Sequence, residues 1–175
     1  MNGKIIAIVL VVSGLLAGAG MYWTQVHAFY ERVDPEVADV QLTGLVSGMS
    51  EPVAYENYQG IDADSSPLRY RACFDVMQSV TELRERYVTY PAPVPLEAPG
   101  WFDCYDAGEV GAALETGEAV AFLGESNVVY GIDRVVAVFR DGRARSWHQI
   151  NACGAEVFEG RPPPEGCPPP PERTE

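Results

Sequence analysis

The chain has 175 residues, 47% of them hydrophobic, and a formal net charge of −13 from 25 acidic and 12 basic side chains. An apolar fraction of this size is ordinary for a globular protein and argues against wholesale disorder. The negative charge argues against nucleic acid as a partner, because affinity for phosphate backbones comes largely from Lys and Arg. The length leaves room for one domain beside an anchor and a tail.

The first element is an uncharged apolar run over residues 5–23. As a helix at about 1.5 Å per residue it would span roughly 28 Å, which is close to the hydrocarbon thickness of a bilayer. Lys4 precedes the run, and Tyr22 and Trp23 end it where an aromatic belt is expected. The sequence therefore predicts a single transmembrane helix, with the N-terminus in the cytoplasm and the following domain outside it.

A cleaved signal peptide is the alternative interpretation of this run. Ala17-Gly18-Ala19 matches the small-x-small pattern of a cleavage site. The apolar character continues beyond that site to Trp23, which favours an uncleaved anchor. Either interpretation exports the domain.

Gly14 and Gly18 form a GxxxG pattern, so this face of the helix is a candidate for pairing with a second transmembrane helix. Beyond the membrane we expect the helix to continue over residues 27–33 and to end near Asp34-Pro35, since a residue before Pro leaves the α region. Residues 1–33 would then form a cytoplasmic stub, a transmembrane helix and a helical extension.

The four cysteines, Cys73, Cys104, Cys153 and Cys167, indicate two disulfides, because their number is even and the domain is exported. Three connectivities are possible. We favour Cys73–Cys104 with Cys153–Cys167, since each pair is the closest in sequence and the second would tie down the C-terminal tail. A metal site or a redox motif is the alternative, but the CxxC spacing of such sites is absent.

Residues 34–150 show the strand and helix patterns of one α+β domain. In Leu68–Val76 apolar residues alternate with Arg69, Arg71, Cys73 and Asp75, which predicts a half-buried strand. The expected elements, in chain order, are a strand over residues 40–46 that Gly48 ends, a loop over 51–67, a strand over 68–76, a helix over 79–87, an extended crossing over 90–95, a helix over 106–116 with Asp106 as its N-cap and Gly117 as its stop, and a strand over 119–123.

Asp141-Gly142 stands between two strand-like runs, residues 134–140 and 143–150, and predicts a tight hairpin. With Phe139 opposite Ala144, one face of the hairpin carries a cluster of basic side chains beside a Trp. On so acidic a protein that face is a candidate for docking an acidic partner, although a solvated sheet face is the more ordinary interpretation. The candidate docking residues are Arg134, Arg140, Arg143, Arg145 and Trp147.

The chain ends in a Pro-rich stretch, residues 151–175, which we expect to be an extended tail tied by a disulfide. His148 is the single His of the domain, and no nucleophile motif accompanies it, so a structural role is expected. No catalytic, cofactor-binding or metal-binding motif is present, and we expect neither an enzyme nor a cofactor.

Five segments carry a resemblance to a known family: Met1-Asn2-Gly3-Lys4, residues 68–74, residues 130–138, Asp141-Gly142-Arg143 and residues 147–151. Together they resemble an uncharacterised alphaproteobacterial family of single-pass membrane proteins with a domain of unknown function. The resemblance implies a Gram-negative inner membrane with a periplasmic domain, and it transfers no residue role. Some members are labelled histidine kinase, but this sequence has neither an ATP-binding glycine box nor a helical phosphoacceptor His.

The sequence thus predicts an α+β fold, in which a transmembrane helix carries a small antiparallel-sheet domain with two short helices and a Pro-rich tail. The first hypothesis for its function is a periplasmic interaction module, an accessory or assembly factor that contacts another protein of an inner-membrane complex. The alternative is a sensor of a periplasmic ligand or of the state of the envelope. A second alternative is an enzyme that uses His148 or an unpaired Cys.

Overall fold

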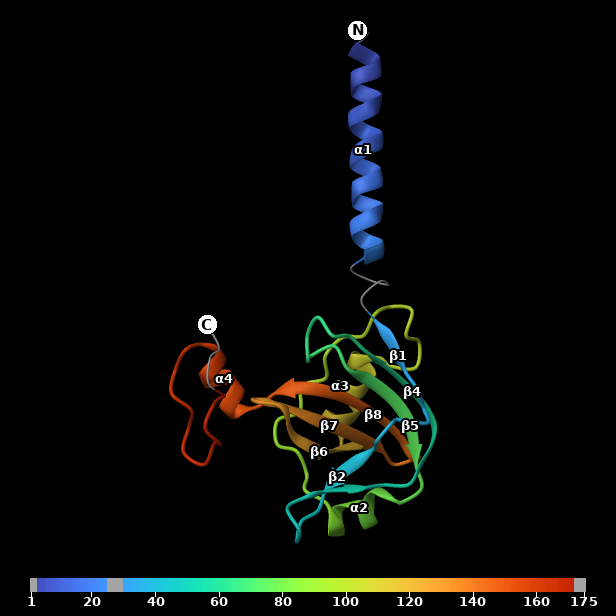
Figure 1. Ribbon diagram of the computed structural model, residues 1–175. Coiled ribbons are helices and arrows are strands. Elements are labelled where there is room, and N and C mark those ends of the chain that lie inside the picture. The colour runs from blue at the N-terminus through green and yellow to red at the C-terminus, as the bar shows by residue number, and fades with distance from the viewer. Residues whose placement is uncertain (1–2, 25–29, 172–175) are drawn as a thin grey trace.

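The computed structural model describes residues 3–24 and 30–171. One apolar helix, α1 (Gly3–Trp23), precedes a domain built on an antiparallel sheet (Figure 1). α1 is long and apolar enough to cross a membrane, with a mean hydropathy of 2.3, and none of it is buried against the domain. The α+β class and the N-terminal apolar helix are confirmed.

The main sheet has six strands in the order β1-β4-β5-β8-β7-β6, and every neighbouring pair is antiparallel. A separate hairpin of two strands, β2 and β3, packs beside it. The elements of the domain are β1 (Glu31–Val33), β2 (Gln41–Thr43), β3 (Ser50–Pro52), β4 (Tyr55–Asp62), β5 (Arg71–Val76), α2 (Val80–Arg86), α3 (Ala107–Thr116), β6 (Ala119–Val129), β7 (Ile132–Phe139), β8 (Arg143–Ile150) and α4 (Ala152–Phe158).

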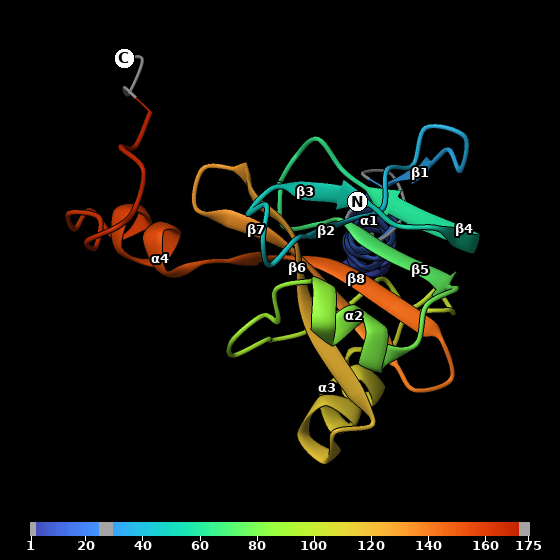
Figure 2. The ribbon, with the colours of Figure 1, turned by 90° about the horizontal axis from the view of Figure 1, so that it is seen from below.

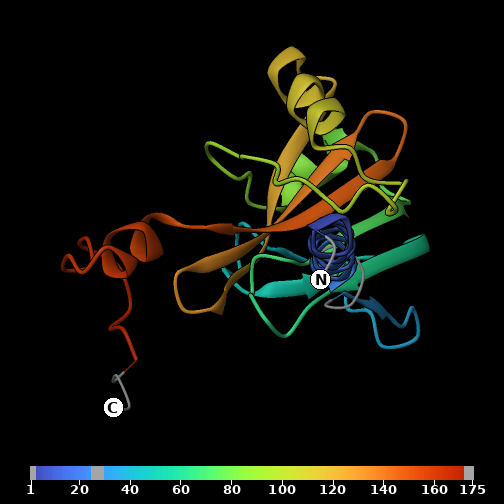
Figure 3. The same ribbon diagram turned by 90° about the horizontal axis from the view of Figure 1, so that it is seen from above.

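Both faces of the sheet are covered. Figures 2 and 3 show the β2–β3 hairpin and α3 on opposite sides of it. Leu42 of β2 and Leu83 of α2 belong to the core on one face, and Val110 of α3 belongs to the core on the other. The prediction that residues 68–76 form a half-buried strand is therefore wrong for β5, because Arg71, on the face expected to be polar, is only 4% exposed.

The segment after α2 joins the small hairpin to the edge of the main sheet. The Val88 N–H donates to the Thr43 carbonyl (2.8 Å), while the Leu123 N–H donates to the Val88 carbonyl (2.9 Å). The Tyr90 N–H donates to the Ala121 carbonyl at 2.9 Å. The outer edge of β6 is thus paired over this stretch, which also fixes the β2–β3 hairpin against the sheet.

The expected helical extension over residues 27–33 is wrong where it can be compared. Residues 25–29 lie outside the described part of the chain, but Glu31, Arg32 and Val33 form β1 and pair with Asp62, Ile61 and Gly60 of β4. Helix propensity is a weak preference, and pairing with an open sheet edge overrides it here.

The expected loop over residues 51–67 is also wrong, since it contains β3 and β4. A bulge hides β4 from a search for alternation. Asn57 takes a left-handed φ of 55°, and the pairing with β5 shifts register between Glu56 and Gln59. The apolar side chains on either side of the bulge are therefore out of phase.

The hairpin of β7 and β8 has a register one residue away from the expected one. Val138, rather than Phe139, lies opposite Ala144, so Val135 pairs with Trp147. The connection has three residues and Gly142 has a φ of +90°, which a side chain would strain. Because side chains alternate between faces, a slip of one residue exchanges the two faces of β8 relative to β7.

The C-terminal tail is more ordered than expected. Asn151 caps α4 by accepting a hydrogen bond from the Gly154 N–H, and this helix was not predicted. Both favoured disulfides, Cys73–Cys104 and Cys153–Cys167, are present. The second ties the Pro-rich segment back to α4, and the two lie together at one side of the sheet (Figure 3).

Candidate functional site

The five residues of the expected docking face do not share one exposed surface. Trp147 is fully buried and Arg145 is 8% exposed, both on the α3 side of the sheet. Arg134 lies on the other side, over the ring of Tyr70. Arg140 stands in the exposed turn and Arg143 is half-exposed, paired with Glu109 and Asp141. The separation follows from the register of β8. A binding role for the exposed arginines stays a prediction.

His148 is buried and has the contacts of a structural residue. Its Nδ1 lies 2.6 Å from the Pro67 carbonyl, and the Arg134 Nε donates to its Nε2 at 3.2 Å. These two bonds fit one neutral tautomer, in which Nδ1 donates and Nε2 accepts. The ring stacks on Tyr70 with centroids 4.6 Å apart. Burial lowers the pKa of His148 from 6.5 to about 4, against a smaller opposing effect of the Pro67 bond.

The candidate pairing face of α1 is open. A Cβ built on Gly14 or Gly18 would meet nothing within 4 Å. The two residues are one helical turn apart and therefore lie on the same side of the helix. Pairing of this face with another membrane helix stays a prediction.

The turn between β2 and β3 exposes three apolar side chains together. Leu45 is 52% exposed, Met49 67% and Val46 fully exposed. We call these three residues the hairpin tip. The sequence predicted a strand through Leu45 and Val46, which would have buried one of them, but β2 ends at Thr43.

The hairpin tip is held rigidly although it is exposed. The Gly44 N–H donates to the Met49 carbonyl (2.9 Å), and the Leu45 N–H donates to the Arg86 carbonyl (2.8 Å). At the base of the hairpin the hydroxyls of Thr43 and Ser50 both donate to the Gly124 carbonyl, at 3.1 and 3.2 Å. The three side chains are therefore presented by a fixed backbone.

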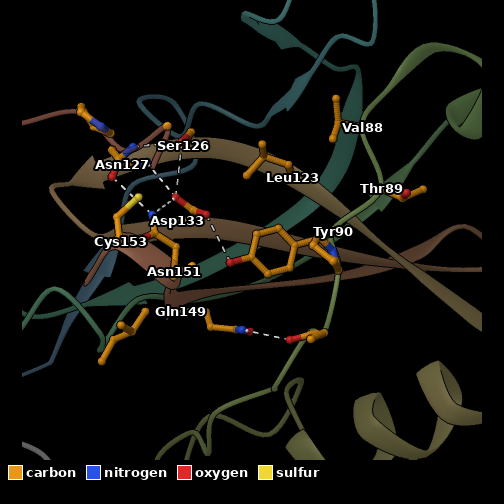
Figure 4. Close-up of a pocket in the computed structure, with 16 residues that line it drawn as sticks. Val88, Thr89, Tyr90, Leu123, Ser126, Asn127, Asp133, Gln149, Asn151 and Cys153 are labelled. Atoms are coloured by element: carbon orange, nitrogen blue, oxygen red, sulfur yellow. Dashed lines mark hydrogen bonds between the residues drawn. The ribbon is translucent and has the colours of Figure 1, made fainter. Parts of the chain in front are cut away.

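A pocket of about 580 Å³ lies at the other end of β6, where the β6–β7 hairpin meets the start of α4. The segment 88–92 forms one wall, and Cys153, Gly166 and Pro168 of the tied tail form another. Asp133, Tyr90 and Asn151 meet in its interior (Figure 4). The pocket is thus built from four stretches of chain that are distant in sequence.

Asp133 organises the polar part of this pocket. Its Oδ1 accepts hydrogen bonds from the Asn127 N–H (2.9 Å) and the Asn151 Nδ2 (2.7 Å), with the Ser126 hydroxyl at 3.5 Å. Its Oδ2 accepts one bond, from the Tyr90 hydroxyl at 3.2 Å. The side chain is buried. Burial raises the pKa of Tyr90, and the charge of Asp133 raises it further.

Metal and thiol chemistry find no residues in the part of the chain that the structure describes. There, no group of three His, Cys, Asp or Glu side chains is placed to hold a metal ion. The two disulfides use Cys73, Cys104, Cys153 and Cys167. An enzyme with an unpaired Cys is therefore contradicted.

Sequence reasoning missed both the hairpin tip and the Asp133 pocket. The tip had a signal, since Leu45 and Val46 are consecutive apolar residues followed by Ser47-Gly48, a pair that favours a turn. The pocket had no local signal, because its walls come from separate stretches of chain.

Comparison with known proteins gives one match. A family model described as a family of unknown function, DUF6446, matches residues 40–168, which is most of the chain and nearly all of the domain. No curated protein and no solved structure matches.

Proposed function

The chain belongs to DUF6446, a family of unknown function, and we propose that it is a membrane-anchored interaction module whose domain binds another protein outside the cytoplasm. In this role it is an accessory or assembly factor of a membrane complex. The exposed hairpin tip is the observation that carries the proposal.

The proposed location is the inner membrane of a Gram-negative cell, with the N-terminus in the cytoplasm and the domain in the periplasm. Lys4 before the apolar helix supports this orientation, since basic residues stay on the cytoplasmic side. The two disulfides support it as well, because such bonds persist in oxidising compartments.

The hairpin tip has the properties of an anchor for a protein partner. Exposed Leu, Val and Met side chains gain free energy when they leave water, at about 25 cal/mol per Å² of apolar area. Since the backbone of the turn is already fixed by hydrogen bonds, little conformational entropy is lost when it binds. A few such preorganised side chains carry most of the energy in protein interfaces.

We propose that the partner presents an apolar pocket with a basic rim. Lys4 is the single charged residue before Glu31, so the rest of the chain has 25 acidic residues against 11 Arg and a net charge of −14. A basic surface is attracted to such a domain, and an anionic lipid surface is repelled. The tip also lies at the end of the domain away from α1 (Figure 1). Both observations favour a protein over the membrane as its occupant.

The test is a pulldown of the full-length tagged protein from native membranes, with mass spectrometry of the captured proteins. Val46→Glu with Met49→Glu places two charges in the tip without touching the core. We expect a stoichiometric membrane partner with the wild type and its loss with this variant. Captured proteins that are equally abundant in both samples would contradict the proposal.

Met77→Glu is the matched control, because Met77 is 64% exposed, close to the 67% of Met49, and lies at the end of β5 rather than in the tip. We expect this control to retain the partner. Arg140→Glu with Arg143→Glu tests the arginines of the hairpin of β7 and β8 in the same assay. Loss of the partner in that variant alone would move the docking surface from the tip to those arginines.

A sensor of a small ligand is the second candidate function, and the pocket at Asp133 favours it. A volume of about 580 Å³ lies within the range of roughly 300–1,000 Å³ that is usual for ligand sites. The two functions are compatible, since the pocket and the hairpin tip involve different residues.

A further inference from the structure

The Asp133 pocket combines a polar interior with apolar walls. Leu123, Ile150, Pro91 and Pro168 contribute apolar surface around the buried carboxylate. Such a pocket fits a small organic molecule with one polar group and an apolar body. The chemistry of Asp133 decides which polar group that is.

The carboxylate of Asp133 has neutral hydrogen-bond donors. The Asn127 N–H, the Asn151 amide and the Tyr90 hydroxyl each donate to it, and none of them carries a charge. None of the sixteen residues that line the pocket is Lys, Arg or His. Neutral donors stabilise a carboxylate but leave its net charge in place, so the pocket has a negative potential.

One oxygen of Asp133 retains capacity for a further bond. A carboxylate oxygen accepts about two hydrogen bonds, and Oδ2 has a single protein donor, the Tyr90 hydroxyl at 3.2 Å. Gln149, by contrast, is fully used. Its amide bonds the Val94 N–H, the Trp147 indole and the Ala92 carbonyl. The main unused acceptor in the pocket is therefore the charged one.

These properties exclude several classes of ligand. An anion would meet Asp133 without a cation to offset it. A polyol needs several open donors and acceptors, and the amides of Gln149 and Asn151 are already engaged. A divalent cation needs several oxygen ligands, usually with more than one carboxylate, and Asp133 is the single acidic residue of the lining.

We propose that this pocket binds the ammonium group of a small organic amine, with Asp133 as its counter-ion and the surrounding apolar side chains against its body. A hydrogen bond from an ammonium to a carboxylate is charge-assisted and stronger than one between neutral groups. Outside the pocket, the net charge of −14 on the rest of the chain raises the local concentration of cations. The proposal is independent of the hairpin tip, so either one can fail alone.

The test is the thermal unfolding of the full-length protein in detergent with three probes of one shape. These are 2-phenylethylamine, the neutral 2-phenylethanol and the anionic 3-phenylpropanoate, at a pH where the amine is protonated. A ligand at ten times its Kd raises Tm by about 3–6 °C in a protein of this size. We expect that rise with the amine and none with the alcohol or the acid. Equal shifts with all three probes, or none with the amine, would refute the proposal.

Asp133→Asn is the variant that isolates the charge. An Asn can still accept at Oδ1 from Asn127 and Asn151, so the network around it is retained in outline. We expect the amine to bind at least about tenfold more weakly, which corresponds to the loss of one charge-assisted bond. Unchanged affinity for the amine in this variant would overturn the assignment.

Ile150→Trp is a second variant, in case Asp133→Asn fails to fold. Ile150 lines the pocket and is 40% exposed, so a larger ring there fills space without entering the core. We expect this variant to lose the amine-dependent rise in Tm while keeping its own stability. A full rise in Ile150→Trp would place the amine outside the pocket.

Discussion

Arg71 shows how a charged residue can be structural in a domain that otherwise keeps its charges at the surface. Its guanidinium donates to backbone carbonyls alone, including those of Leu68 (2.8 Å), Leu96 (2.8 Å) and Glu97 (2.9 Å). Burial lowers the pKa of Arg71. The side chain fastens the segment 96–97 onto β5, and no pattern in the sequence distinguishes it from an exposed strand arginine.

His148 gives the residue scale a testable pH dependence. Burial lowers its pKa from 6.5 to about 4, so the folded protein keeps the ring neutral where the unfolded chain becomes protonated. Its contribution to stability is therefore complete above pH 6.5 and is lost as the pH falls from 6.5 to 4. We expect wild-type protein to lose of the order of 1–2 kcal/mol more than His148→Gln between about pH 7 and about pH 5.

The measurement is thermal unfolding of both proteins at each pH, followed by the fluorescence of Trp147, which is fully buried when folded. His148→Gln cannot titrate in this range, so it reports the pH dependence of all other groups. Parallel curves of Tm against pH for the two proteins would show that His148 is not buried as a neutral ring.

At the scale of elements, α4 depends on the closest approach between two backbones in the domain. A Cβ on Gly154 would lie within 2.8 Å of the Gly131 Cα, in the turn of the β6–β7 hairpin. We expect Gly154→Ala to separate α4 and the tied tail from that turn, because backbone cannot yield as a flexible side chain does. Hydrogen exchange of residues 152–158 should then accelerate, while the core strands keep their protection.

Gly111→Ala is the matched control, since a Cβ at this position in α3 meets nothing within 4 Å. We expect unchanged exchange in α4 and a gain of about 0.5–1 kcal/mol in stability, because Ala favours a helix over Gly. If Gly154→Ala also left the exchange of α4 unchanged, the contact with Gly131 would not be what holds the helix.

Elements whose signals are local were predictable from the sequence, and those that depend on partners were not. Asp106 and Gly117 mark the ends of α3 as expected, since capping involves neighbouring residues. The hairpin of β7 and β8 was predicted, but its register was not, because a one-residue difference in the turn leaves the apolar pattern almost unchanged. β1 forms only because β4 offers it an edge.

The candidate sites follow the same division. The disulfide pairing was predictable from sequence distance, and the apolar helix from composition. The docking face of arginines depended on the hairpin register and separated when that register changed. The Asp133 pocket exists only after β6, β7, α4 and the segment 88–92 have come together, so no window of sequence contains it.

At the scale of the whole molecule, α1 determines where the domain can act. Seven residues separate Trp23 from Glu31, and eight steps of extended chain span at most about 29 Å. If α1 remains attached, the start of β1 stays within that distance of the membrane, and the hairpin tip faces away from it (Figure 1). If the run is instead cleaved after Ala19, the domain is released.

We expect α1 to remain attached, because its apolar stretch continues to Trp23 and has the length of a membrane span. The intact mass of protein purified from membranes should include residues 1–19, and alkaline washing should leave it in the membrane fraction. Ala19→Leu, which blocks a small-x-small cleavage site, should have the mass expected from the substitution alone. A wild-type chain that begins at Gly20, together with an uncut Ala19→Leu, would show that the run is a signal peptide. The domain would then reach its partner without a membrane anchor.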